Sequence, residues 1–127
     1  MAGRILDGRR GENRRGNHFF MNESDLTNRI RLHLADKFPG LISWRNSIGF
    51  DSRAKVYYGI GGRGGSDIIL LYRGKFGAIE VKKPGAVTEP ERLSNQSNFL
   101  RVIKEGGGLA GFASSVEEAE MIVRGEG

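Results

Sequence analysis

Cysteine is absent from this chain of 127 residues, and histidine occurs only as His18 and His33. Without cysteine the chain forms neither disulfides nor thiolate zinc sites, which fits a reducing cytosolic setting. Two histidines are too few for a zinc site built on several imidazoles, and they argue against histidine-rich nuclease motifs and a Ser-His-Asp arrangement. We expect His33 at the boundary of a helix and assign it no chemistry.

Long apolar segments are also missing. The longest uninterrupted apolar run covers residues 68–72, well short of a membrane span, and no signal-peptide pattern appears. We therefore expect a cytoplasmic protein. A chain of this length suits one domain with a single core.

Positive charge is in excess and unevenly distributed. The net charge is +5, which suggests a polyanionic partner. Residues 1–21 hold five arginines against two acidic residues, a balance of +3. These residues are Arg4, Arg9, Arg10, Arg14, Arg15, Asp7 and Glu12. We divide the chain into a basic N-terminal arm, residues 1–21, and a folded domain, residues 22–127.

Two roles are open for the arm. A segment rich in glycine and arginine is typical of a tail that binds phosphates without sequence preference. Its last residues, Phe19, Phe20 and Met21, favour instead an anchor on its own core or on a neighbouring subunit.

Two successive strands are predicted over residues 67–72 and 75–82. The first is a nearly continuous apolar run, typical of a buried strand, and a short glycine-containing turn follows it. A two-residue loop sets Asp67 opposite Glu80, whereas a three-residue loop would set it opposite Val81. The simplest hairpin therefore brings two carboxylates together.

Side-chain alternation adds a lysine to this pair. Glu80 and Lys82 share one face of their strand, while Val81 points into the core. Carboxylate oxygens are hard ligands suited to Mg²⁺, and an ammonium beside them can stabilise charge on a phosphate or orient a water. The alternative is a weakly paired Glu80 and Lys82 on a solvated face, because the E-x-K triplet is common.

A glycine-rich loop, residues 59–65, precedes the first of these strands. It lacks the G-K-[ST] ending of a P-loop, and no helix follows it as dinucleotide binding would require. Five glycines in seven residues predict an irregular segment. We expect a flexible wall over a bound polyanionic strand, with Arg63 available to a phosphate; a merely mobile surface loop is the alternative.

The remaining elements complete an α/β fold. The first helix begins at Asn22 or Ser24 and ends before Pro39. Its buried stripe consists of Leu26, Ile30, Leu34 and Phe38. Strands are expected over 41–46 and 109–113, with a short extended piece over 55–58. Trp44, Tyr57 and Tyr58 could stack on bases, but we expect them in the core and assign none to DNA.

The second helix is predicted to begin with a capping box, Thr88-x-x-Glu91, and to run to about residue 105. Its apolar stripe contains Leu93, Gln96, Leu100 and Ile103. A glutamine facing the sheet must find a polar partner, and the nearest candidates are the acid and the lysine of the preceding strand. A boundary glutamine reaching solvent is the alternative. Ser114 or Ser115 caps a last helix through Val123.

Several motifs in this order resemble those of the VRR-NUC (virus-type replication-repair nuclease) domain of the PD-(D/E)XK nuclease superfamily. They are Gly64-Gly65-Ser66-Asp67, Ile79-Glu80-Val81-Lys82-Lys83-Pro84-Gly85, Thr88-Glu89-Pro90-Glu91, Gln96 and Gly106-Gly107-Gly108. The resemblance covers residues 22–124. One departure is Ser66, which stands where many members have proline. The resemblance implies a restriction-endonuclease-like core (αβββαβ), a mixed sheet flanked by helices.

It also implies a Mg²⁺-dependent endonuclease, with Mn²⁺ able to substitute. The expected catalytic residues are Asp67, Glu80, Lys82 and Gln96. The expected metal ligands are Asp67, Glu80, the backbone carbonyl of Val81, and Glu23, which matches an acidic residue early in the first helix of the family; a capping acid is the alternative for Glu23. The expected nucleic-acid contacts are Arg63, Ser66, Lys83, Arg9, Arg10, Arg14 and Arg15.

Stand-alone members from viruses and bacteria resemble Holliday-junction resolvases, so the expected substrate is branched DNA in repair. Cutting two strands symmetrically needs two active sites, which favours a homodimer or a higher homo-oligomer. The expected setting is the cytoplasm of a bacterial or phage-infected cell. Three alternatives are a non-catalytic nucleic-acid-binding domain with this fold, an RNA nuclease using the same site, and a structural subunit assembled through its arm. Paired carboxylates argue against a pure binder, because they repel phosphate.

Overall fold

The computed structural model describes residues 21–127. The nucleic-acid contacts predicted for the basic N-terminal arm, at Arg9, Arg10, Arg14 and Arg15, therefore lie outside the described residues, as do Phe19 and Phe20. Of the three apolar residues at the end of the arm, Met21 is described, and it packs partly buried against the core of the domain.

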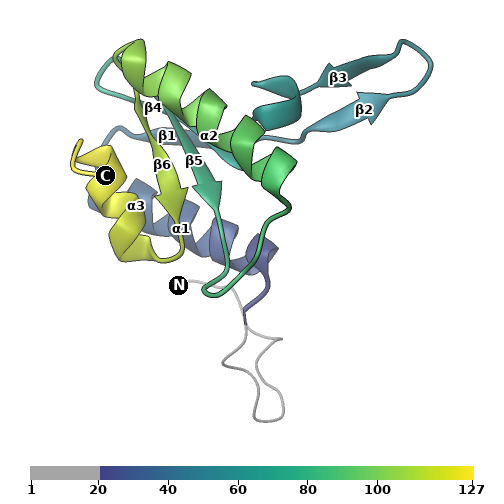
Figure 1. The fold of residues 1–127 in the computed structure, drawn as a ribbon. Coiled ribbons are helices and arrows are strands. Elements are labelled where there is room, and N and C mark those ends of the chain that lie inside the picture. The colour runs from purple at the N-terminus through teal and green to yellow at the C-terminus, as the bar shows by residue number, and fades with distance from the viewer. Residues whose placement is uncertain (1–20) are drawn as a thin grey trace.

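A four-stranded mixed sheet forms the centre of the domain (Figure 1). Its strands are β1 (Ile42–Arg45), β4 (Ile68–Tyr72), β5 (Lys75–Val81) and β6 (Leu109–Ala113), and they lie in the order β1-β4-β5-β6. The first three run antiparallel, and β6 runs parallel to β5. The predicted mixed sheet is confirmed.

The turn between β4 and β5 fixes the register that the site requires. Tyr72 pairs with Lys75, so the loop has two residues, and both of them have positive φ, 51° at Arg73 and 80° at Gly74. Two such residues match the twist of antiparallel strands. The predicted two-residue loop is confirmed, and the same register carried past Ile68 and its partner Ile79 leads to Asp67 and Glu80.

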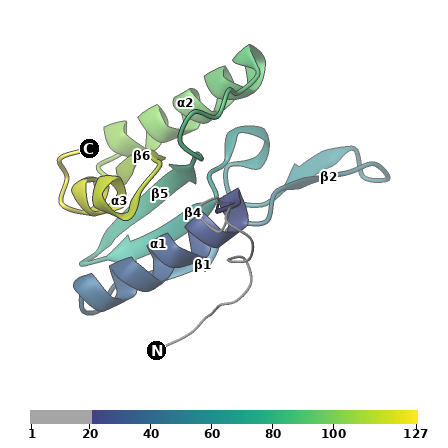
Figure 2. The same cartoon turned by 90° about the horizontal axis from the view of Figure 1, so that it is seen from below.

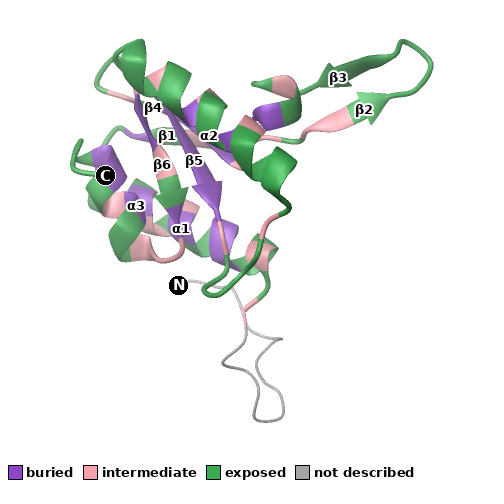
Figure 3. Ribbon diagram, viewed as in Figure 1, coloured by how far each residue is buried: buried purple, intermediate pink, exposed green. Residues whose placement is uncertain are grey.

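Helices cover both faces of the sheet. Figure 2 shows α1 (Glu23–Lys37) and α3 (Val116–Val123) on one face and α2 (Pro90–Glu105) on the other. The larger core lies under α1 and α3, where the predicted α1 stripe from Leu26 to Phe38 is buried, as the purple segments of Figure 3 indicate. A smaller core under α2 joins Leu100 to the opposite face of the sheet.

The helix ends are explained by local capping. Asn22 caps α1 by accepting a hydrogen bond from the backbone N–H of Asp25 at 2.7 Å. Of the two predicted helix starts, Asn22 and Ser24, the first is confirmed. Ser115 caps α3 through the N–H of Glu118, at 3.1 Å. His33 on α1 contacts Glu120 on α3, and this hydrogen bond lowers the pKa of the Glu120 carboxyl.

Two predictions for α2 are wrong. The cap is Glu89, which accepts from the N–H of Arg92 at 2.9 Å, and not Thr88, whose hydroxyl is bonded elsewhere. Leu93 is 40% exposed although it has the spacing of the buried stripe. The beginning of α2 extends past the strands in Figure 1, so the sheet does not cover this residue.

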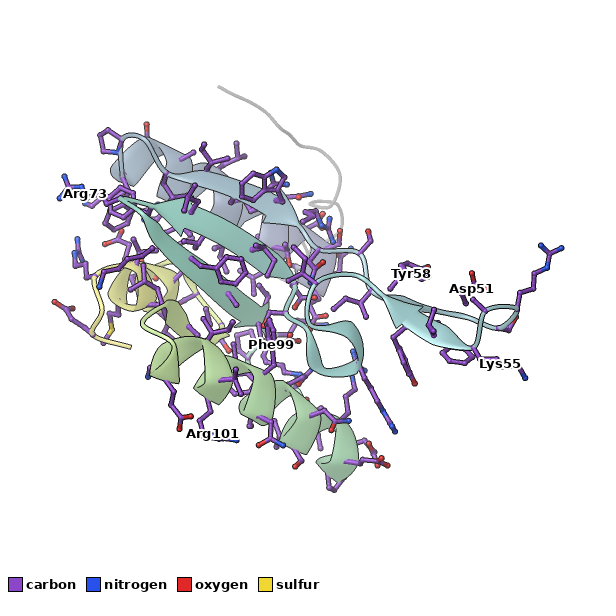
Figure 4. All side chains as sticks on the ribbon, turned by 90° about the horizontal axis from the view of Figure 1, so that it is seen from above. Asp51, Lys55, Tyr58, Arg73, Phe99 and Arg101 are labelled. Atoms are coloured by element: carbon purple, nitrogen blue, oxygen red, sulfur yellow. The ribbon has the colours of Figure 1, made fainter. Side chains whose placement is uncertain are left out.

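A second, two-stranded sheet is inserted between β1 and β4. Its strands β2 (Gly49–Asp51) and β3 (Val56–Tyr58) pair with each other, with no further strand beside them in the described part of the chain, and project from the domain (Figures 1 and 4). The extended piece predicted at 55–58 is confirmed as β3, whereas β2 was not predicted. Tyr57 and Tyr58, like Trp44 on β1, are about half exposed, so the expectation that they lie in the core is wrong.

Within residues 21–127, no helix is both long and apolar enough to cross a membrane.

The unequal burial of two leucines on α2 gives a matched test of this packing. Leu100→Ala should lower the free energy of unfolding by about 2–5 kcal/mol. The Leu100 side chain is only 4% exposed, so its removal leaves a cavity between α2 and the sheet. Leu93→Ala should cost less than about 1 kcal/mol. Urea unfolding followed by circular dichroism measures both, and equal losses would contradict the position of α2.

Candidate active site

The end of β5 carries an acid and a base that face α2. Glu80 is the last residue but one of the strand and is only 3% exposed, and Lys82 follows the strand. Lys82 Nζ lies 3.7 Å from Glu80 Oε2. Between them, Val81 is fully buried in the core on the other face. The predicted alternation is confirmed, and the solvated-face alternative does not fit a buried Glu80.

Gln96 connects the two side chains. Its Nε2 donates to Glu80 Oε2 at 3.0 Å, and its Oε1 accepts from Lys82 Nζ at 2.9 Å. Only this orientation of the amide satisfies both neighbours, because a carboxylate accepts and an ammonium donates. Gln96 is 4% exposed, so its predicted direction toward the sheet is confirmed and the solvent-facing alternative is wrong.

Thr88 is a member of the site that the sequence did not indicate. Its Oγ1 accepts a second hydrogen bond from Lys82 Nζ at 2.8 Å. Thr88 and Gln96 therefore hold the ammonium from two sides. A threonine just before a helix is usually its N-cap. Nothing in the sequence distinguishes a capping threonine from one that accepts a hydrogen bond from a lysine.

Asp67 approaches from the neighbouring strand. It directly precedes β4, and its Oδ2 accepts a hydrogen bond from the backbone N–H of Val81 at 2.9 Å. This bond ties Asp67 to the end of β5 beside Glu80. The two carboxylates that the sequence placed opposite each other are thus close together.

The pKa of Glu80 is raised from 4.5 to about 8. Burial is the main cause, followed by the negative charge of Asp67; the Lys82 ammonium opposes them, and a hydrogen bond with Asp67 and the charge of Glu23 add smaller increases. In the metal-free protein the protonated form of Glu80 is therefore favoured far more than in a solvent-exposed carboxyl. A cation between the carboxylates would remove their repulsion, so the donor set fits a hard divalent ion.

Glu23 does not complete a three-carboxylate cluster. It lies in the first turn of α1, near enough for its charge to affect Glu80. Yet within residues 21–127 no three histidine, aspartate or glutamate side chains gather closely enough to hold a metal ion. Mg²⁺ commonly binds through two protein carboxylates plus water and phosphate, which Asp67 and Glu80 suffice to provide. The role of Glu23 and of the Val81 carbonyl stays a prediction from the resemblance.

The glycine-rich loop packs against α2. It contains a 3₁₀ turn, Gly62–Gly64, so the expectation of an irregular segment is wrong. A Cβ added to Gly64 would lie 2.3 Å from the carbonyl oxygen of Asn95 on α2. Glycine is required here because the loop backbone directly touches the helix backbone.

Asn46, which the sequence also did not indicate, fastens the base of the β2–β3 hairpin to the site. Its side-chain Nδ2 donates to the carbonyls of Ile60, at 2.7 Å, and Ser66, at 2.9 Å, while its Oδ1 accepts from the N–H of Ile60 at 3.0 Å. Its backbone N–H donates to the carbonyl of Asp67 at 2.8 Å. One residue thus holds the chain near the beginning of the glycine-rich loop, at Ile60, and directly after its end, at Ser66 and Asp67.

The predicted nucleic-acid contacts within the described residues differ in exposure. Arg63 is exposed and pairs with Glu91 of α2 at 2.8 Å, a surface ion pair weak enough to be exchanged for a phosphate. Lys83 is exposed. Ser66 is fully buried, and its Oγ has no hydrogen-bond partner among residues 21–127. A buried side chain does not fit the predicted contact with nucleic acid.

Comparison of the chain with protein-family models, with curated proteins and with solved structures finds no match.

The raised pKa of Glu80 predicts how stability changes with pH. Between the unfolded pKa of 4.5 and the folded pKa of about 8, the folded protein keeps a proton that the unfolded chain loses. Stability from this group is therefore greatest below 4.5 and declines as the pH rises toward 8. Glu80→Gln removes this titrating group. In thermal melts from pH 5 to 8.5, the melting temperature of the variant relative to that of the wild type should therefore rise with pH.

The same melts test the metal. Mg²⁺ competes with the proton on Glu80, so it should stabilise the wild type more at pH 8.5 than at pH 6, and stabilise Glu80→Gln little at either pH. If the difference in melting temperature between the wild type and Glu80→Gln is the same at every pH, Glu80 does not titrate in this range.

Proposed function

We propose that this chain is a Mg²⁺-dependent endonuclease that hydrolyses phosphodiester bonds in DNA, with a restriction-endonuclease-like core of the VRR-NUC type. The observation that carries the proposal is the hydrogen-bonded set Glu80, Gln96 and Lys82 beside Asp67. Two close carboxylates can hold a divalent ion, and an ammonium fixed beside them by an amide can stabilise charge on a phosphate, which together suit metal-assisted phosphodiester hydrolysis.

In this proposal Asp67 and Glu80 hold the ion. When bound, Mg²⁺ would polarise the phosphodiester and lower the pKa of an attacking water. Glu80 would hold the ion as a carboxylate and would give up its proton to solvent, because the cation would supply the compensating charge in its place. Burial of Glu80 excludes bulk water from this side of the site and strengthens its electrostatic interactions.

Lys82 acts on the reacting phosphate. Two of its three N–H bonds are taken by Gln96 and Thr88, which leaves the third to orient a water or to stabilise negative charge developing on the phosphate. Gln96 and Thr88 are positioning residues, because they act through the ammonium and Glu80. The fixed position of Lys82 lowers the reorganisation needed during the reaction.

Branched DNA and a homodimer remain parts of the proposal that derive from the resemblance. The net charge of +5 supports a polyanionic substrate. DNA and RNA present the same phosphate to the ion, so the substrate must be identified by experiment. A purely binding domain is less well supported, because it has no use for a protonated, buried acid bonded to an oriented amide.

The nuclease assay uses the full chain with labelled four-way junction, linear duplex, single strand and RNA, each with Mg²⁺ and with chelator. We expect metal-dependent cleavage of the junction. Glu80→Gln and Lys82→Ala should each lower the rate roughly a hundredfold or more. Junction binding in chelator should persist, because it depends mainly on contacts with other phosphates, such as those predicted at Arg63 and Lys83.

Three results would redirect the proposal. Cleavage of RNA in preference to every DNA would identify an RNA nuclease using this site. Metal-independent binding with no cleavage of any substrate would favour the non-catalytic domain. Rates unchanged in Glu80→Gln would mean that cleavage occurs elsewhere.

Thr88 offers a matched pair for the positioning role. Thr88→Val removes the hydroxyl that accepts from Lys82 while keeping the shape of the side chain, and it should lower kcat roughly 10- to 100-fold with little change in KM. Thr88→Ser keeps the hydroxyl and should remain close to the wild type. Equal loss in both variants would indicate that Thr88 matters through packing and not through Lys82.

A further inference from the structure

The β2–β3 hairpin, residues 49–58, exposes large side chains that no other element within residues 21–127 covers. Phe50, Val56, Tyr57 and Tyr58 are each about half exposed. An isolated two-stranded hairpin has little stability in water by itself, and monomers rarely present clustered apolar side chains without use. Figure 4 shows the hairpin extending from the domain, with Asp51, Lys55 and Tyr58 along it.

The two faces of the hairpin differ. On one face Phe50 pairs with Tyr57 across the strands, with ring centroids 5.0 Å apart, edge to face. The Arg63 guanidinium lies 6.0 Å from the centroid of the Tyr57 ring. We call Phe50, Tyr57 and Arg63 the ring face. On the other face Tyr58 lies over Gly49, where a Cβ would be 2.2 Å from its Oη, so this ring packs on its own ribbon.

The ring face continues toward the candidate active site. Arg63 pairs with Glu91 in the first turn of α2. Thr88, just before that helix, holds Lys82. Asn46 ties the base of the hairpin to Asp67 through its side-chain and backbone hydrogen bonds. The ring face is therefore attached to both sides of the site.

Charge and side-chain type indicate the ligand. The hairpin carries the cations Arg53 and Lys55 near its tip, and its one acid, Asp51, accepts hydrogen bonds from the backbone N–H groups of Arg53 and Ala54 in the turn. It contains no asparagine or glutamine with which to read base edges in a groove. Aromatic rings beside cations are instead suited to stacking on unpaired bases while contacting their phosphates.

We propose that the ring face binds an unpaired strand of nucleic acid next to the bond that is cut. The location relative to the cut rests on the proposed function, whereas the binding itself does not. A second copy of the chain fits this face less well. In a two-fold contact Arg53, Lys55 and Arg63 would meet a partner surface with the same excess of cations.

The test measures binding in chelator, by fluorescence anisotropy, of a labelled oligothymidine and a labelled blunt duplex to the full chain. Phe50→Ala and Tyr57→Ala should weaken binding of the single strand roughly 5- to 100-fold each and affect the duplex less. Val56→Ala, on the opposite face of the same hairpin, is the matched control and should bind as the wild type does.

A second variant guards against loss of the hairpin itself. Phe50→Trp in a Trp44→Phe background keeps a ring at this position, and its emission should be quenched by the oligothymidine but not by the duplex. Unchanged single-strand affinity in both alanine variants, or an unquenched tryptophan, would overturn the proposal. If the alanine variants have a lower mass in solution than the wild type but the same affinity for the oligothymidine, the ring face is a contact between copies of the chain and the proposal is overturned. Loss of single-strand binding in a protein that cuts nothing would support the ring face while refuting the nuclease.

Discussion

A buried carboxyl held by a single amide is the constraint on which the rest of the site depends. Glu80 is 3% exposed beside a second carboxylate, so ionising it is unfavourable without a compensating charge. Gln96 provides a donor for Glu80 and an acceptor for Lys82 at the same time. An apolar residue of the same shape would remove one hydrogen-bond partner from each group, and an acid would add a third carboxyl group beside Asp67 and Glu80. Position 96 on α2 therefore requires a neutral side chain that carries both a hydrogen-bond donor and an acceptor.

That arrangement depends in turn on strand register. A slip of one residue in β5 would turn Glu80 into the core under α1 and α3 and present Val81 to α2. The register is fixed where the chain reverses, because Arg73 and Gly74 both adopt positive φ and close a two-residue turn. The geometry of a turn at one end of the sheet thus determines which side chains meet at the other end.

The parts of this structure that the sequence predicted are those governed by local rules. Turn length set Asp67 beside Glu80, alternation set Glu80 and Lys82 on one face, and helical spacing brought Gln96 toward them. The sequence did not predict the roles of Thr88 and Asn46. Both residues commonly cap or terminate elements, and only tertiary partners distant in the sequence assign their hydrogen bonds. The aromatic residues of β3 were expected in the core because burial is the common fate of such residues, and no local signal reveals a strand that lacks a covering layer.

The exposed hairpin and the buried site are mechanically related through Asn46. If a strand binds to the ring face, any displacement of the hairpin also acts on its base, where Asn46 lies. Asn46 holds Ile60 and Ser66 through its side chain and Asp67 through its backbone. The carboxylate of Asp67 is in turn fixed by the N–H of Val81. A shift of the hairpin without a shift of Asp67 would have to break hydrogen bonds of Asn46, whereas a shared movement would break the bond to Val81. If both proposals hold, the geometry favours a substrate that reaches the ring face and the two carboxylates without displacing the hairpin or Asp67.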